Sequence, residues 1–147
     1  MTEKMQTENN IDGTKRYKKV MVIDDTFVDR FIAEKIMNQY GFAEEIIMKD
    51  SAAGALEYLT DCVKNNEAFP QLIFLDIRMP GMDGFGFLEE YEKLPAEIKS
   101  NCIIIMLYTL LQRGEREKAE QNPYVKMILD KPLDKEKLEM LFTKINP

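Results

Sequence analysis

LIFLDIRMPGMDG, residues 72–84, places four apolar residues directly before a carboxylate, Asp76, and follows them with a loop that contains two glycines. A short, continuous apolar run bounded by turn residues predicts a strand that is buried on both faces. Pro80 lacks an N–H and disfavours the helical region for Met79, so the strand has to stop before them. The stretch therefore places Asp76 at the carboxyl end of a buried strand, where open parallel α/β sheets build their sites.

Apolar runs and helical patterns alternate on both sides of this stretch. Strands are predicted at residues 18–23, 45–49, 72–75, 102–107 and 125–129, and the helices are predicted to begin at Thr26, Ser51, Gly84, Gly114 and Asp134. Repeated βα units with apolar central strands predict a parallel sheet covered by helices on both faces. Five such units favour an α/β fold of the flavodoxin-like (βα)5 type, with strand order 2-1-3-4-5.

Two of the predicted helices differ in how much apolar surface they carry. The first begins at Thr26, with Asp29 three residues later as an approximate capping box. Residues at helical spacing predict the stripe that packs inward, with the stem of Lys35 at its edge: Val28, Phe31, Ile32, Lys35, Ile36 and Tyr40. The helix over residues 114–121 has only Ala119 to bury, so we expect it to be loosely held.

The composition suits one globular domain that does not bind nucleic acid or anionic membranes. The chain has 147 residues and a net charge of −6, which argues against binding to nucleic acid or to anionic membranes. Residues 1–16 are polar and without periodicity, so we expect a disordered tail before a single domain at residues 17–147. The start of the chain lacks the apolar region of a signal peptide, and Cys62 and Cys102 are too few for a disulfide framework. These features predict a cytoplasmic location.

The ends of three predicted strands carry charged residues: Asp24 and Asp25, then Asp76, then Lys131. Each feature alone is an ordinary turn or cap, but in the predicted strand order all of them meet at one edge of the sheet. Two carboxylates repel by roughly 4 kcal/mol at about 4 Å in an effective dielectric of about 20, so the cluster needs a cation. Carboxylate oxygens favour Mg²⁺, with Mn²⁺ as the alternative. Lys131 can bind one anionic oxygen of a phosphoryl group.

The chain contains no histidine. This excludes histidine general-base catalysis, histidine-ligated zinc and any phosphohistidine carried by this chain. A phosphohistidine that takes part in its chemistry therefore has to belong to a partner.

These motifs resemble the receiver domains of response regulators, the phosphoacceptor modules of two-component signalling. The residues that carry the resemblance are Ile23-Asp24-Asp25, the run from Leu75 to Gly84, and Lys131-Pro132. The similarity extends over residues 17–145, which is nearly the whole predicted domain.

The resemblance implies a role for each charged residue at the strand ends. Asp76 would be the phosphoacceptor, and Asp25 and Asp76 would bind Mg²⁺ directly, with the Arg78 carbonyl as third ligand. Asp24 would act mainly through a metal-bound water. Lys131 would bind the acyl phosphate, and a cis peptide bond would precede Pro132.

The family also has a small hydroxyl residue after the fourth strand and often an aromatic residue in the fifth. Tyr108 and Thr109 are both candidates for the hydroxyl, and we assign it to Thr109 because the tyrosine hydroxyl lies far out on its ring. Ile128 replaces the aromatic residue, and its β-branched side chain cannot swing as a tyrosine would. We therefore expect the moving part to be the loop and weak helix over residues 108–121.

The sequence thus predicts a stand-alone response regulator that is not an enzyme. It would accept a phosphoryl group from a histidine kinase or a histidine phosphotransfer protein, and would signal to a downstream protein or relay the phosphate, as a monomer or as a phosphorylation-dependent dimer. A phosphorylation-independent scaffold is the alternative. A metal-dependent phosphohydrolase is disfavoured because Arg78 stands where such enzymes have a second aspartate. A flavin-binding domain is disfavoured because no strand end offers a loop rich in Gly, Ser and Thr.

Overall fold

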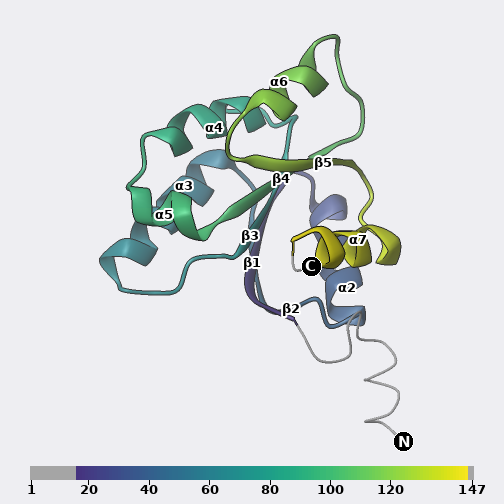
Figure 1. Cartoon of the computed structure of the whole chain (residues 1–147), viewed down its shortest axis with the longest axis horizontal. Helices are drawn as coiled ribbons and strands as arrows, with labels where there is room; N and C mark the ends of the chain where they lie inside the picture. Colours follow the sequence, from purple (N-terminus) through teal and green to yellow (C-terminus); the bar gives the residue numbers. More distant parts are fainter. Residues whose placement is uncertain (1–15, 146–147) are drawn as a thin grey trace, which may run out of the picture.

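Five parallel strands form one sheet in the order β2-β1-β3-β4-β5 (Figure 1). The structure, a computed structural model, describes residues 16–145, and the predicted tail therefore lies outside the described residues except for Arg16. The strands are β1 (Tyr17–Ile23), β2 (Ala43–Lys49), β3 (Leu72–Asp76), β4 (Ile103–Tyr108) and β5 (Val125–Asp130). The helices are α2 (Phe27–Gln39), α3 (Ala52–Lys64), α4 (Gly84–Glu92), α5 (Ala96–Asn101), α6 (Glu115–Gln121) and α7 (Lys135–Ile145). The predicted flavodoxin-like fold class is confirmed.

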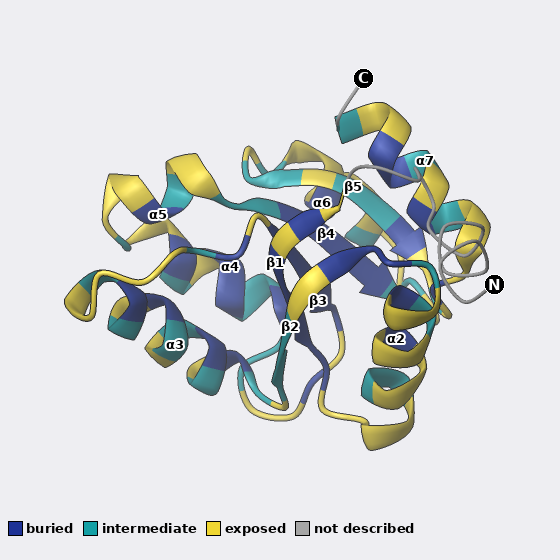
Figure 2. Cartoon of the chain, turned by 90° about the horizontal axis from the view of Figure 1, so that it is seen from below, coloured by how far each residue is buried: buried dark blue, intermediate teal, exposed yellow. Residues whose placement is uncertain are grey.

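The sheet separates two apolar cores, one on each face. Successive strand residues point to opposite faces, so Val20 and Val22 pack with α2 and α7, whereas Met21 and Ile23 pack with α3, α4 and α5. Figure 2 shows the same division, with α2 and α7 on one side of the sheet and α3, α4 and α5 on the other. The central strand β3 is buried along its whole length, as its apolar run predicts.

Helix α5 is an element that the sequence analysis did not predict. We expected one helix after Gly84, ending before Pro95, but Pro95 is the N-cap of a further short helix that buries Ile98. Proline interrupts a helix because it lacks an N–H, yet it is tolerated at a helix start, where that N–H has no partner. Helix α4 thus ends at Glu92, before Pro95, and α5 begins directly after it.

The predicted inward stripe of α2 is wrong in its first half, although Ile36 does pack against the core. Val28, Phe31 and Ile32 are 58%, 52% and 37% exposed, and the residues that α2 buries are Ala33 and Met37. Apolar residues lie on more than one side of this helix, and periodicity alone does not decide which side contacts the sheet. The predicted capping box is also absent, because Thr26 makes no side-chain cap.

Helix α6 agrees with its prediction, since Ala119 is its one buried residue. The predicted caps at two other helices are present as well. The Ser51 hydroxyl accepts a hydrogen bond from the Gly54 N–H at 3.0 Å, and the Asp134 carboxylate accepts one from the Lys137 N–H at 2.9 Å.

Candidate functional site

The acidic residues after β1 and β3 meet at the carboxyl edge of the sheet. The two strands are neighbours, with Ile23 paired to Leu75, so the residues that follow them are brought together. Asp24, Asp25 and Asp76 each offer a carboxylate oxygen, and these oxygens all lie within 4.8 Å of one another. Asp24 and Asp76 are buried, whereas Asp25 is exposed. The three carboxylates therefore form one cluster that is open to solvent on the Asp25 side.

Lys131 places its ammonium group among these carboxylates. Its Nζ lies 3.0 Å from Asp24 Oδ2 and 3.2 Å from Asp76 Oδ1. A third carboxylate, Asp29 Oδ2 from the first turn of α2, is closer still at 2.7 Å. The Lys131–Pro132 peptide bond is cis, as the resemblance implies.

Asp29 is a residue of this site that the sequence analysis treated only as a helix cap. Its contact with Lys131 spans 102 positions in the chain, and no local pattern in the sequence indicates it. An acidic residue one turn after Asp24 and Asp25 is the available signal, since a helix that starts at the sheet edge directs its first turn toward the same site.

Burial and like charge alter the acid–base properties of the cluster. Burial raises the pKa of the Asp76 carboxyl from 3.8 to about 6, and the charge of Asp24 adds to this increase while Lys131 opposes it. Burial would lower the pKa of the Lys131 ammonium, but hydrogen bonds to Asp29 and Asp24 and the charge of Asp76 raise it overall. Lys131 is therefore a permanent cation here, and Asp76 is a carboxylate that lacks a full countercharge.

A cavity of about 360 Å³ opens above Asp76. Thr109 and Leu110, which follow β4, line it together with Asp25, Thr26, Asp29, Asp76, Arg78 and Lys131. Tyr108 is engaged elsewhere, because its hydroxyl accepts a hydrogen bond from Arg116 Nη2 at 2.8 Å. Of the two candidate hydroxyl residues, the structure thus brings Thr109 to the cavity.

The loop after Asp76 is fixed at both of its ends. Gly84 begins α4 so close to β3 that a Cβ there would lie 2.7 Å from the Asp76 carbonyl oxygen, a contact that only glycine avoids. Near the other end, the Arg78 guanidinium forms a two-pronged ion pair with the Glu115 carboxylate of α6, with Nη1 to Oε2 at 2.7 Å. The loop therefore connects Asp76 to two helices.

The ligand set of the cluster fits a small divalent cation. Three carboxylate oxygens lie close enough to share one ion. A cation bound by them would reduce the repulsion among the carboxylates that Lys131 alone does not neutralise. Oxygen ligands of this kind suit Mg²⁺ or Mn²⁺ better than softer metals. Arg78 lines the same cavity, and the part of its carbonyl in the ligand set stays a prediction.

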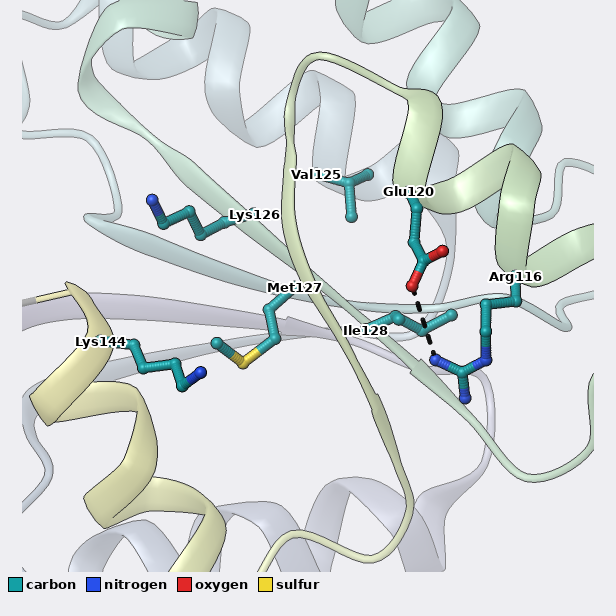
Figure 3. Close-up of a pocket in the computed structure, with 7 residues that line it drawn as sticks. All are labelled: Arg116, Glu120, Val125, Lys126, Met127, Ile128 and Lys144. Carbon is teal, nitrogen blue, oxygen red and sulfur yellow. Dashed lines mark ion pairs between the residues drawn. The ribbon is translucent and has the colours of Figure 1, made fainter.

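A larger cavity, of about 520 Å³, lies at the open edge of β5 (Figure 3). Its walls come from α6, β5 and α7: Arg116, Glu120, Val125, Lys126, Met127, Ile128 and Lys144. Its one carboxylate, Glu120, is already paired with Arg116 at 3.8 Å. It thus lacks the unbalanced acidic cluster that makes the strand-end cavity a candidate for phosphoryl chemistry.

Fold, acid cluster and cavity together define an α/β domain with an acidic site at its sheet edge. The sequence pattern of the response regulator receiver domain matches residues 20–143, so the chain belongs to that family. It is a receiver domain of two-component signalling, as the resemblance in the sequence indicates.

Curated relatives include signalling proteins of several architectures. The chain is 30% identical to the chemotaxis protein CheY of Bacillus subtilis over 81 residues, which cover 55% of this chain and 62% of the relative. It is 28% identical over 89 residues to the sporulation initiation phosphotransferase F of the same organism, covering 60% of this chain and 63% of that protein. The chain spans less than two thirds of the length of these relatives.

Solved structures of receiver domains superpose on most of the chain. A two-component response regulator from Cytophaga hutchinsonii has a TM-score of 0.82 and 26% identity, covering 90% of this chain and 100% of that one. The receiver domain of the histidine kinase CKI1 from Arabidopsis thaliana, solved with Mg²⁺ and BeF₃⁻, has a TM-score of 0.71 and 26% identity, covering 89% and 91%. Over residues 16–145, no helix combines the length and the apolar character that crossing a bilayer requires.

Proposed function

We propose that this receiver domain accepts one phosphoryl group on Asp76 with Mg²⁺ bound by Asp25, Asp76 and the Arg78 carbonyl, and by Asp24 mainly through a metal-bound water. The observation that carries the proposal is the position of Asp76, which is buried, belongs to the acidic cluster and lies 3.2 Å from Lys131. Phosphoryl transfer needs positioning and charge neutralisation more than covalent assistance, and this geometry offers both.

In the proposed step, one Asp76 carboxylate oxygen forms a bond to phosphorus while the bond from phosphorus to the donor nitrogen breaks. The electron pair of the broken bond stays with the imidazole of the donor, and Asp76 becomes an acyl phosphate. Bound Mg²⁺ would neutralise charge on the transferred group. Lys131 binds a phosphoryl oxygen, and Thr109, which lines the same cavity, donates its hydroxyl hydrogen to another.

The proposed donor is a phosphohistidine on a histidine kinase or a histidine phosphotransfer protein, because this chain has no histidine. Four exposed apolar residues of α2 beside the site support docking of a partner protein there: Phe27, Val28, Phe31 and Ile32. Clustered apolar side chains of this size on a surface commonly mark interaction sites. The phosphorylated domain would then bind a downstream protein or relay the group. Two free thiols agree with a cytoplasmic location.

The alternative is a scaffold that uses the receiver fold without phosphorylation. Such a scaffold would have no need for a buried aspartate whose pKa is raised to about 6, because the charge of that aspartate destabilises the fold. A phosphoacceptor does need a buried carboxylate at this position, so the charge of Asp76 favours the phosphoacceptor over the scaffold. A phosphohydrolase is disfavoured because the side chain of Arg78 is engaged by Glu115 and supplies no acid or base. We propose a signalling acceptor rather than an enzyme.

The test is intact-mass measurement after incubation with acetyl phosphate and Mg²⁺. The parent should gain one phosphoryl group and Asp76→Asn none, because the amide oxygen is not a nucleophile of this kind. Asp83→Glu is the matched control: it keeps a carboxylate that can cap α4 from the same loop and should be labelled like the parent. Labelling that persists in Asp76→Asn would place the acceptor elsewhere, and absence of labelling in the parent would favour the scaffold.

A further inference from the structure

Asp29 makes the shortest contact of the Lys131 ammonium group, although no part of the proposed transfer step uses it. The distance from Nζ is 2.7 Å, against 3.0 Å for Asp24 and 3.2 Å for Asp76. Asp29 belongs to α2, whereas the other two carboxylates follow strands of the central sheet. The amine of Lys131 therefore connects a helix to the phosphoacceptor edge.

The ammonium group of Lys131 is surrounded by carboxylates in the resting site. A lysine ammonium has three N–H donors and no acceptor. Three carboxylate oxygens surround this one within 3.2 Å. Nζ donates hydrogen bonds to Asp24 and Asp29 and forms an ion pair with Asp76, so a phosphoryl oxygen that approaches Nζ competes with these carboxylates.

Asp29 is the partner that can leave with the smallest penalty. Its side chain is 32% exposed, compared with 2% for Asp24 and 5% for Asp76, so water can solvate it once it is released. It lies in the first turn of α2, where the helix dipole favours a negative charge. Release of Asp24 would leave a buried carboxylate without its cation, which is far more costly. Asp76 itself becomes part of the acyl phosphate in the proposed step, so Asp29 is the free carboxylate that can move away from Lys131.

We propose that Asp29 is a positioning residue that holds Lys131 in the resting site and exchanges with the phosphoryl group when Asp76 is modified. The proposal rests on the proposed function, because the phosphoryl oxygen is the group that takes the place of Asp29. In this exchange Asp29 and the phosphoryl group compete for Lys131. When the phosphoryl group binds, the first turn of α2 is released from Lys131. Phosphorylation is thereby communicated to α2, the helix whose exposed apolar residues border the site.

The exchange is tested with beryllofluoride, an acyl-phosphate mimic, at saturating Mg²⁺. Asp29→Asn keeps the shape of the side chain and removes the charge that competes for Lys131. It should bind beryllofluoride about three- to tenfold more tightly than the parent, as expected when a charged hydrogen bond no longer has to be broken. Asp29→Glu, which restores the charge, should return the affinity toward that of the parent.

Asp50→Asn is the matched control. Asp50 is an exposed residue that follows β2 at the same edge of the sheet. Asp50→Asn therefore changes the net charge by the same amount as Asp29→Asn. Its effect should stay below about twofold, since interactions between solvent-exposed charges are strongly screened at physiological salt. An equal gain in Asp50→Asn and Asp29→Asn would show that only overall charge matters, and weaker binding in Asp29→Asn would show that Lys131 needs Asp29 to bind the phosphoryl group. Either result overturns the exchange.

A spectroscopic measurement follows Asp29 itself. In the parent, the ¹³C signal of the Asp29 carboxylate should move toward that of a solvated carboxylate when beryllofluoride binds, and in Lys131→Ala the signal should not respond. An Asp29 signal that is unchanged in the parent under saturating beryllofluoride refutes the exchange while leaving the acceptor role of Asp76 intact. A parent that binds no beryllofluoride at all would reject the proposed function together with the exchange.

Discussion

Asp76 carries a negative charge that the resting site only partly balances. Burial and Asp24 raise its pKa from 3.8 to about 6, and Lys131, which it shares with Asp24 and Asp29, compensates incompletely. A carboxyl whose pKa is higher in the folded state binds protons more tightly there than in the unfolded chain. The contribution of Asp76 to the free energy of unfolding should therefore rise as the pH falls from about 7 to about 4.

Asp76→Asn should stabilise the fold at neutral pH when Mg²⁺ is absent. The pKa difference between 3.8 and about 6 corresponds to about 3 kcal/mol at pH 7. We expect a measured gain of about 1–3 kcal/mol, since the asparagine also loses the ion pair with Lys131. Urea denaturation in EDTA at several pH values should show the gain shrinking between pH 6 and pH 4. Glu34→Gln, an exposed change on α2, is the control, and a gain of Asp76→Asn that is independent of pH would contradict the assigned cause.

The segment from Thr109 to Gln121 is weakly attached to the rest of the domain. Its helix α6 buries only Ala119, and the pairing of Glu115 with Arg78 ties it to the loop after Asp76. An element with little buried apolar surface opens easily and responds to small changes in free energy. A phosphoryl group on Asp76 that recruits the Thr109 hydroxyl should therefore order this segment first.

Hydrogen exchange with and without beryllofluoride should detect this ordering. Protection should rise across residues 109–121 and change little in α7, whose buried residues keep it packed on the other face of the sheet. In Thr109→Ala the increase should shrink while Asp76 is still phosphorylated. A response that is lost in Tyr108→Phe and retained in Thr109→Ala would instead assign the hydroxyl to Tyr108, which in the resting structure contacts Arg116.

Binding of Mg²⁺ should stabilise the whole domain, because the ligands come from both β1 and β3 and are assembled only in the folded state. A metal present at ten times its dissociation constant adds about 1.4 kcal/mol to the free energy of unfolding. For a domain of this size, we expect the melting temperature to rise by a few degrees, as measured by circular dichroism. Asp25→Asn should lose most of this increase. Equal stabilisation of the parent and Asp25→Asn by Mg²⁺ would exclude Asp25 from the ligand set.

The fold could be predicted from the sequence because its central strands are apolar along their whole length and end in charged residues. Strand order then required Asp24, Asp76 and Lys131 to meet, and they do. The orientation of α2 could not be predicted, because Ala33 and Met37 pack against the sheet while Val28, Phe31 and Ile32 are exposed, and both sets have helical spacing. Asp29 escaped prediction for a related reason: its partner lies on an element far away in the chain, and its position one turn into a helix also suits an ordinary cap.

Gly84 has a practical consequence for protein engineering. The Gly84 N–H donates a hydrogen bond to the Ile77 carbonyl oxygen, and there is no room for a Cβ between Gly84 and the Asp76 carbonyl oxygen, so β3, its loop and the first turn of α4 pack as one unit. A side chain at Gly84 or an extra residue in the loop would separate the acceptor from the helix that supports it. Transplanting the acceptor aspartate into another α/β scaffold would accordingly require residues 72–87 as a unit, together with a receiving sheet whose neighbouring strand ends in a pair of acids.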